Sequence, residues 1–342
     1  MVIVSLIQTE PGLLSRLFFF IKSATMNQLI NSENVVRRKN KIIPRILIIL
    51  GIIIFISLLS LILYHFVFKN FSEKTSISDL KQAWNKYDYE TVYNSSSEIL
   101  IEKPFNNSAL TYHGYSAFYL AVSQTDTALA QSYLDEAINS MRNAIPSAKP
   151  SLIPQLEYML GKAYFYKNSI NTYYYADLAI KYLLAAKKHG YEANDIPEYL
   201  GLSYAALGQT KESISSFTEA LLIRESDTLL LSIAEQYYKL EQPSAAKQYL
   251  FRIIQNSEND ELVIKSRNLL ANIYIDEKSY NDAKTEFEMI LKKNKNFADA
   301  YYGLGVIYEK QGDLVKARAE WRKALKLQVN HANALSKISY YK

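Results

Sequence analysis

The stretch that decides the fold is residues 301–308, which read Tyr-Tyr-Gly-Leu-Gly-Val-Ile-Tyr and are followed by Ala317, Trp321 and Ala324. The same pattern occurs one period earlier as Leu270, Ala271, Tyr274, Ala283, Phe287 and Ile290. The step from Ala271 to Gly305 is 34 residues. Self-similarity at a fixed period of this size is typical of a solenoid. A solenoid offers an extended surface rather than a closed catalytic pocket.

The pattern recurs along most of the chain. Its central small residue stands at Gly114, Gly161, Gly201, Ala234, Ala271 and Gly305, with Leu80 as a degraded first copy. An aromatic residue follows three positions later, on the same face of a helix, at Tyr164, Tyr204, Tyr237, Tyr274 and Tyr308. A second small residue follows at Ala137, Ala179, Ser213, Ala246, Ala283 and Ala317. Gly208 and Gly312 fall between the two predicted helices, where a turn requires positive φ.

This pattern resembles the tetratricopeptide repeat (TPR) family over residues 73–331. The resemblance implies an all-α fold, a right-handed α-solenoid of about seven TPR helix pairs behind one N-terminal transmembrane helix. The predicted repeats are 73–106, 107–153, 154–193, 194–226, 227–263, 264–297 and 298–331. Pro104 matches the family's proline at the end of a copy, where it stops a helix. Residues 332–342 are predicted to form a capping helix.

Two copies depart from the period. The small residues are twelve positions apart in the regular copies, but eighteen apart from Gly161 to Ala179 and twenty-three from Gly114 to Ala137. The added residues, near 119–129 and 168–173, contain neither proline nor glycine, which predicts longer helices rather than long loops. Two interpretations stay open, neutral drift and a docking surface built from taller hairpins.

Charge and cysteine content exclude several classes of protein. Residues 1–45 hold seven Lys/Arg and two Asp/Glu, and the remaining residues hold 32 of each sign. Nucleic-acid binding requires a basic face on the folded domain, and a neutral repeat array does not favour one. The chain has no cysteine, which excludes disulfides, thiolate zinc sites and a thiol nucleophile.

Residues 46–68 form an apolar run of 23 residues without a formal charge. A helix of this length, about 34 Å, exceeds the roughly 30 Å of a bilayer's hydrocarbon core. No small-residue cleavage site follows, so we predict an uncleaved transmembrane anchor. Basic residues are concentrated before the run, at Arg37, Arg38, Lys39, Lys41 and Arg45. The positive-inside rule therefore predicts a cytoplasmic tail (1–45) and an extracytoplasmic repeat domain.

Residues 1–25 fit this arrangement poorly, because the run 17–21 is too short to span a membrane. One hypothesis is that translation begins at Met26. An Ile-, Lys-, Asn- and Tyr-rich composition indicates an AT-rich bacterial genome. Together these features predict a bacterial inner-membrane protein with a periplasmic TPR domain.

The sequence contains no pattern that indicates catalysis. Histidines at 113, 189 and 331 are scattered, without the spacing of a metal-binding pair, and no nucleophile elbow or phosphate-binding glycine loop is present. We therefore expect no enzymatic activity, no metal or other cofactor and no small-molecule substrate.

The family resemblance implies that the first helix of each pair lines a concave binding surface. The residues that it places there, and that we predict as a partner-binding groove, are Tyr115, Phe118, Tyr119, Tyr158, Lys162, Phe165, Tyr166, Tyr238, Asn268, Asn272 and Tyr302. Tyrosine and phenylalanine favour binding at low entropic cost. An aromatic stripe at helical spacing also forms cores, and both interpretations stay open for Tyr115, Phe118, Phe165 and Tyr166. The Lys/Asn/Arg clamp by which some TPR domains hold a chaperone tail is absent, with Glu235 and Val306 at matching positions.

The predicted function is a membrane-anchored scaffold that mediates protein–protein interactions during assembly of a cell-envelope complex. The layout is similar to the ancillary subunit of the bacterial translocon and to TPR proteins of the spirochaete flagellar collar, by architecture alone. The alternative is an extracytoplasmic receptor for a glycan or peptide held on the aromatic groove.

Overall fold

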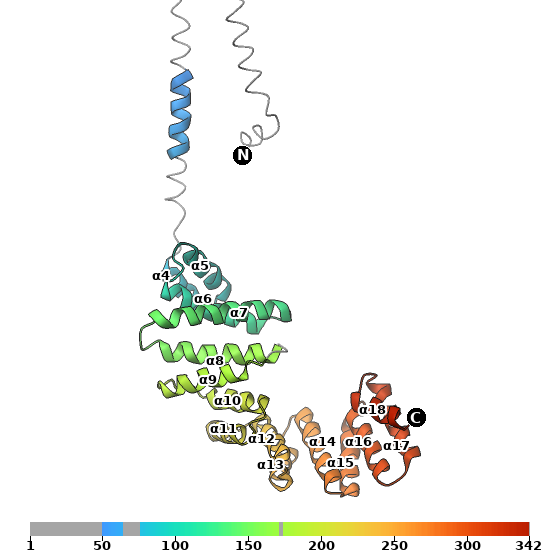
Figure 1. The fold of residues 1–342 in the computed structure, drawn as a ribbon. Helices are drawn as coiled ribbons and strands as arrows, with labels where there is room; N and C mark the ends of the chain where they lie inside the picture. The colour runs from blue at the N-terminus through green and yellow to red at the C-terminus, as the bar shows by residue number, and fades with distance from the viewer. Residues whose placement is uncertain (1–49, 64–75, 171–173, 342) are drawn as a thin grey trace, which may run out of the picture. The chain divides into compact units, whose positions relative to one another are not determined.

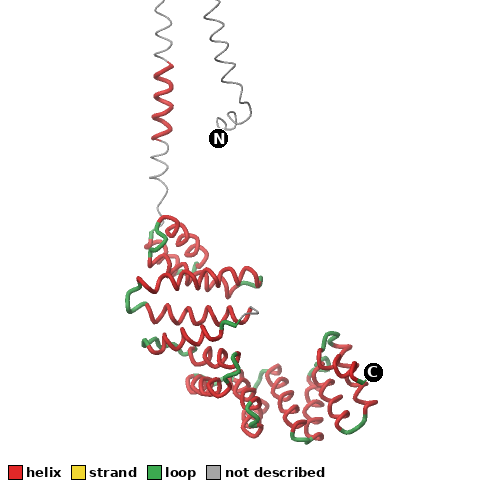
Figure 2. The backbone as a smooth tube through the Cα atoms, viewed as in Figure 1, coloured by secondary structure: helices red, strands yellow, loops and turns green. Residues whose placement is uncertain are grey.

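The computed structural model describes residues 50–63, 76–170 and 174–341. The chain divides into two compact units, Met1–Lys74 and Thr75–Lys342. The secondary structure of the described residues is helical throughout, with short connecting loops and no strand (Figure 2). The all-α prediction is confirmed for these residues.

The described part of the first unit is one helix over residues 50–63. Its large apolar side chains are all exposed, by 47% to 66%. Among the residues that the structure describes, no helix is both long and apolar enough to cross a membrane. The ends of the predicted anchor, 46–49 and 64–68, lie outside the described residues, as do the predicted tail 1–45 and the alternative start at Met26.

The second unit is a series of helices in which each contacts the next (Figure 1). Its first part contains α4 (Ile77–Asn85), α5 (Tyr89–Glu102), α6 (Asn107–Ser123), α7 (Thr127–Ala144), a short 3₁₀ turn (Ile145–Ser147), α8 (Ile153–Ile170) and α9 (Ala176–Lys188). The regular pairs follow as α10 (Ile196–Ala206), α11 (Thr210–Ile223), α12 (Asp227–Lys239), α13 (Pro243–Asn256), α14 (Asp260–Asp276), α15 (Tyr280–Lys293), α16 (Ala298–Lys310) and α17 (Leu314–Leu327). The last described helix is α18 (Ala332–Tyr340).

One packing rule holds the pairs together. A Cβ atom added at Gly201 or Gly305 would lie 2.5 Å from Phe217 or 2.4 Å from Trp321, both on the second helix of the same pair. In these pairs the large residue follows the small one by sixteen positions. At these two positions glycine is required, because the backbone of the first helix rests directly against a bulky side chain of the second.

The two lengthened pairs obey the same rule. A Cβ atom at Gly161 would lie 2.6 Å from Leu183, and one at Gly114 would lie 2.5 Å from Met141. From Gly161 to Leu183 the spacing is six residues longer than sixteen, and from Gly114 to Met141 it is eleven residues longer. These differences equal the lengths of the two insertions. The inserted residues near 119–129 extend α6 and α7 and leave only three residues between them. The longer helices predicted there are confirmed, and residues 171–173 after α8 are not described.

Glycines form turns between paired helices, and side-chain hydrogen bonds hold the last described helix. Gly208 and Gly312 adopt φ values of 71° and 83°, as the sequence predicts for the turns between paired helices. At the end of the unit, α18 packs on the last pair. Lys337 and Tyr341 both donate hydrogen bonds to the carboxylate of Glu309, at 2.6–2.8 Å and 2.6 Å respectively. Trp321 is fully buried beneath this end.

The first helices of successive pairs form a second set of contacts. Direct contacts join α4 to α6, α6 to α8 and α8 to α10, and again α12 to α14 and α14 to α16. Contact between α10 and α12 is weaker than in these pairs. The row of first helices is therefore less closely packed between α10 and α12.

Candidate partner-binding face

The predicted aromatic residues of α6 and α8 divide into buried and partly exposed members. Tyr115, Phe118 and Tyr158 are 5%, 2% and 8% exposed and belong to the hydrophobic core that runs from α6 to α10. A side chain this deeply buried packs within the fold, so the core interpretation holds for Tyr115 and Phe118. Phe165 and Tyr166 are only partly buried against that core, as is Tyr119.

The partly exposed rings form a connected layer, which we term the aromatic face (Tyr89, Tyr119, Phe165, Tyr166 and Tyr199). Tyr89 and Tyr119 stack with ring centroids 4.5 Å apart. Phe165 meets Tyr199 edge to face at 4.9 Å, and the hydroxyls of Tyr166 and Tyr199 lie 3.3 Å apart. Buried Phe118 bridges the layer, since it contacts Tyr119 at 5.5 Å and Tyr166 at 5.7 Å. Rings from α5, α6, α8 and α10 are thereby held in fixed positions.

A charged group is built into this layer. The Lys162 ammonium donates hydrogen bonds to the Tyr158 hydroxyl at 3.1 Å and to Asp195 at 3.0 Å. It also lies 5.1 Å from the ring centroid of Tyr158 and 4.9 Å from that of Tyr199, in cation–π range. The Tyr158 hydroxyl donates to the Asp195 carboxylate at 2.8 Å. These contacts tie α8 to the start of α10.

The electrostatics of the tyrosines follow from this environment. Burial, together with the hydrogen bond to Asp195, raises the pKa of Tyr158 far above its ordinary value. Burial and the contact with Tyr166 raise the pKa of Tyr199 in the same way. Both phenols therefore stay neutral at physiological pH and act as hydrogen-bonding groups.

The predicted polar residues of the later pairs lie apart from the aromatic face. Tyr238 on α12 donates a hydrogen bond of 2.5 Å to Asp276 on α14, and burial with this bond raises the pKa of Tyr238 to about 12. Asn268 and Asn272 are half-buried on α14. Tyr302 on α16 lies 5.2 Å from the ring of His331. The structure brings together the predicted residues of α6 and α8, whereas those of α12, α14 and α16 are spread along the array.

Sequence reasoning missed Asp195, Tyr199 and Tyr89. Asp195 interacts with a residue 37 positions earlier, in the preceding pair, so a reading of single repeats does not reveal it. Tyr89 belongs to a second helix, which the family pattern assigns away from the binding surface. One signal was present, because the tyrosines of the chain are dense between positions 87 and 204.

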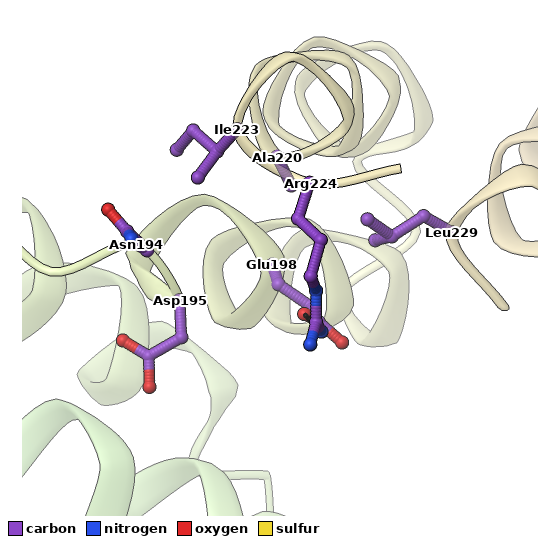
Figure 3. Close-up of a pocket in the computed structure, with 7 residues that line it drawn as sticks. All are labelled: Asn194, Asp195, Glu198, Ala220, Ile223, Arg224 and Leu229. Carbon is purple, nitrogen blue, oxygen red and sulfur yellow. Dashed lines mark ion pairs between the residues drawn. The ribbon is translucent and has the colours of Figure 1, made fainter. Parts of the chain in front are cut away.

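A hollow of about 380 Å³ lies beside Asp195 (Figure 3). It is lined by Asn194, Asp195, Glu198, Ala220, Ile223, Arg224 and Leu229, from α10, the end of α11 and the start of α12. Arg224 reaches from the end of α11 toward Glu198, with 3.7 Å between the charged groups. The hollow lies where the row of first helices is less closely packed, and Asp195 links it to Tyr158 and Lys162.

Other polar clusters in the described residues form internal pairs. His113 interacts with Glu136 at 3.4 Å, His189 with Glu157 at 2.6 Å and His331 with Asp299 at 2.9 Å. Each histidine faces a single carboxylate. No group of three or more potential metal ligands occurs among the described residues.

Comparisons with known proteins identify similar repeat proteins. Residues 181–340 match the family model of the tetratricopeptide repeat protein 21 C-terminal ARM domain. A comparison with curated proteins found no match. The C-terminal part of a TPR repeat-containing protein from Cytophaga hutchinsonii is similar in structure, with TM-score 0.54, 14% identity, and coverage of 77% of this chain and 99% of that one.

Two further solved structures are similar at lower scores. The TPR protein YrrB, described as having an unusual peptide-binding site, gives TM-score 0.44 and 24% identity over 59% of this chain and all of its own. The MamA protein gives TM-score 0.44 and 18% identity over 53% of this chain and 95% of its own. The likeness to the Cytophaga hutchinsonii structure, at 14% identity, concerns the fold alone, which is a TPR-like helical solenoid.

Proposed function

We propose that this TPR-like repeat protein is a membrane-anchored scaffold that binds a partner protein on its aromatic face. The observation that carries the proposal is the layer of half-buried rings from α5, α6, α8 and α10. The face is fixed from below by Phe118 and from the side by Lys162 and Asp195. A surface whose rings are held in place before binding loses little conformational entropy when a partner docks.

The chemistry of the face favours a polypeptide as the ligand. Tyrosine supplies a wide apolar ring and a hydroxyl that donates to or accepts from a main-chain amide. Lys162 adds an ammonium whose bonds to Tyr158 and Asp195 use only two of its three hydrogens. The third hydrogen can be donated to a main-chain carbonyl of a docked segment. A glycan would also stack on tyrosine rings, and it would bind saturably without giving a protein photo-adduct.

The anchor in this proposal is the apolar run 46–68. Its described portion, residues 50–63, is helical and presents apolar side chains around its whole circumference. A helix that is apolar on all sides is stable when a bilayer or another protein covers it. The sequence-based topology then places the repeats outside the cytoplasm of a bacterial cell and keeps the aromatic face near partners in the same membrane. Assembly of a cell-envelope complex is the role we infer from this arrangement.

Site-specific photo-crosslinking tests the binding face. The photo-reactive analogue of phenylalanine, p-benzoylphenylalanine, is placed at Tyr166 on α8 in the full chain in intact cells. The matched control carries the same analogue at Phe251, a 39% exposed residue on the second helix α13. We expect one discrete protein adduct from position 166 and none from position 251, as identified by mass spectrometry.

Alanine variants complete this test. For this step the photo-reactive residue is moved to position 165. The double variant Tyr119→Ala, Tyr166→Ala should reduce adduct formation from that position. Its melting temperature should change little, because both rings lie at the edge of the core. A large loss of stability would assign these rings to the core. Adducts at both 166 and 251 would show non-specific contact, and saturable binding of a peptidoglycan fragment without a protein adduct would favour the receptor function.

A further inference from the structure

We propose that the hollow between α10, α11 and α12 holds an apolar side chain of a partner segment that carries lysine or arginine beside it. This inference rests on the proposed function, because it states the chemistry of a partner lying on the aromatic face. It is carried by the walls of the hollow, by the charges at its rim and by its continuity with that face.

The walls are apolar and partly open. Ala220 and Leu229 are each 3% exposed and form the inner surface, whereas Ile223 is 45% exposed at the opening. Leu222, next to Ile223, is 85% exposed but does not line the hollow. The volume of about 380 Å³ is at the small end of ligand sites, roughly 300–1,000 Å³. Space of this size accommodates one or two side chains rather than an extended segment.

The rim is acidic. The charged lining residues are Asp195, Glu198 and Arg224, and three further acids, Glu192, Glu225 and Asp227, stand within two positions of a lining residue in the sequence. This local excess is part of a wider one, since residues 190–238 hold eight Asp/Glu and two Lys/Arg within a repeat array that is neutral overall. An acidic surface speeds the association of a basic partner and helps to fix the position in which that partner binds.

The internal partners of these carboxylates show which of them is available. Lys162 already holds Asp195, and Arg252 pairs with Glu225. Glu198 has only Arg224, whose side chain is 74% exposed and 3.7 Å away. An exposed ion pair at this distance contributes little, so a lysine or arginine from a partner replaces Arg224 at small cost. Glu192 and Asp227 have no ion-pair partner among the described residues.

The hollow is continuous with the aromatic face. Asp195 lines the hollow and is also bonded to Tyr158 and Lys162, and the Lys162 ammonium lies 4.9 Å from the ring of Tyr199 on the aromatic face. Glu198 and Tyr199 are neighbours on α10, one directed to each feature. A segment lying across Tyr166 and Tyr199 therefore reaches the hollow within the next few residues, and the apolar side chain that it inserts there fixes its register.

Peptide binding tests this chemistry directly. The probe is a fluorescein-labelled twelve-residue peptide of glycine and serine with a central Lys-Leu-Lys, titrated to about 1 mM against the full chain in detergent. Fluorescence polarisation is compared with two matched peptides, in which the leucine is replaced by serine or both lysines by glutamate. We expect the Lys-Leu-Lys peptide to bind about tenfold more tightly than either, and to weaken as salt is raised.

Protein variants locate the site. Glu198→Lys and Ile223→Ser should each weaken binding of the Lys-Leu-Lys peptide about five- to tenfold. The matched controls are Glu212→Lys, an exposed acid on the same acidic segment, and Leu222→Ser, the exposed apolar neighbour, because neither lines the hollow. Both controls should leave the affinity unchanged. Equal affinity for all three peptides, or equal effects of the site and control variants, would overturn the proposal.

The same variants separate this inference from the proposed function. If the photo-adduct from position 166 still forms while the protein binds all three peptides equally, the ligand proposed for the hollow is wrong and the proposed scaffold function is retained. If the adduct is absent as well, both fail. Light scattering of the purified chain adds a further outcome, since self-association abolished by Glu198→Lys would identify a second copy as the occupant and contradict a separate basic partner.

Discussion

The lengthened region of the array comprises the lengthened pairs α6 to α9 and the next helix, α10, which shares their core. It and the regular region, α12 to α17, use one packing rule but produce different surfaces. Pairs in both regions set a small residue on the first helix against a large residue on the second, as Gly161 and Gly305 do. In the lengthened region, a single core cluster extends continuously from α6 to α10. In the regular region the core is divided into separate clusters, and the first helices carry polar residues such as Tyr238, Asn272 and Glu309.

The difference teaches that the side chains carried by the first helices decide what the surface can do. Phe165 and Tyr166 stand four and five positions after Gly161, where Glu309 and Lys310 follow Gly305 in the last pair. The aromatic rings contact one another across pairs, as Phe118 does with Tyr166 and Phe165 with Tyr199. The regular pairs meet mainly through small hydrophobic clusters and ion pairs. We therefore expect the lengthened region to unfold as a larger unit than any regular pair.

The largest expected effect comes from truncating a core anchor in each region. Trp321→Ala and Leu183→Ala each remove a fully buried side chain, at a cost of about 2–5 kcal/mol. Because regular pairs contact only their neighbours, loss of Trp321 should remove hydrogen-exchange protection from α16 to α18 alone. Loss of Leu183 should lower protection together across α6 to α10. An equal spread of lost protection in the two variants would refute the difference in cooperativity.

A smaller effect is expected from adding a single methyl group. Gly305→Ala places Cβ 2.4 Å from the rigid indole of Trp321, and Gly161→Ala places it 2.6 Å from the flexible side chain of Leu183. Overpacking costs about 1–3 kcal/mol, offset by up to about 1 kcal/mol of helix propensity. We expect Gly305→Ala to be the more destabilising in urea unfolding. A reversed order would show that the lengthened hairpin is the more rigid one.

The repeat fold could be predicted because its diagnostic residues recur at fixed, short spacings along the sequence. The small residue, the turn glycine and the buried aromatic residue, as at Gly305, Gly312 and Trp321, recur within one pair and need no knowledge of neighbours. The sequence also predicted that the inserted residues extend the helices, because these residues include neither proline nor glycine. The family resemblance made the aromatic helices of α6 and α8 candidates for the site.

The composition of the candidate site could not be predicted to the same extent. Tyr115 and Tyr119 lie one helical turn apart and are both tyrosines, yet the first is buried and the second is half-exposed. Exposure here depends on the preceding pair, because Trp84 of α4 contacts both rings and Tyr89 of α5 stacks on Tyr119 alone. The hollow beside Asp195 likewise depends on weak contact between α10 and α12, which no single repeat encodes.

Acid should affect the lengthened region through His113. Burial lowers the pKa of His113 although Glu136 opposes the shift, and Tyr93 stacks on the ring. A histidine held neutral in this way stabilises the fold above its unfolded pKa of about 6.5, and that stability is lost as pH falls through the lower folded pKa. We expect His113→Gln to move the acid unfolding midpoint of the lengthened region to lower pH. An unchanged midpoint would mean that another group controls acid unfolding.

Removing one hydroxyl in each region should separate buried from exposed hydrogen bonds. Tyr158→Phe deletes bonds to Asp195 and Lys162 beneath the aromatic face and should cost about 1.5–3 kcal/mol, because it leaves charged groups less well satisfied. Tyr238→Phe deletes a bond to Asp276 that faces solvent, where water replaces it, and should cost less than about 0.5 kcal/mol. Equal losses in denaturant unfolding would contradict the burial assigned to these two sites.

The smallest effect is expected at Tyr115, one helical turn before Tyr119. Its hydroxyl is buried and has no hydrogen-bond partner among the described residues. Burying an unpaired hydroxyl is unfavourable, so Tyr115→Phe removes a cost and keeps the ring packed against Trp84. We expect the free energy of unfolding to stay within about 0.5 kcal/mol of the original or to rise. A loss above about 1 kcal/mol would show that this hydroxyl is hydrogen-bonded in the folded chain and that the lengthened core contains a polar contact that the regular pairs lack.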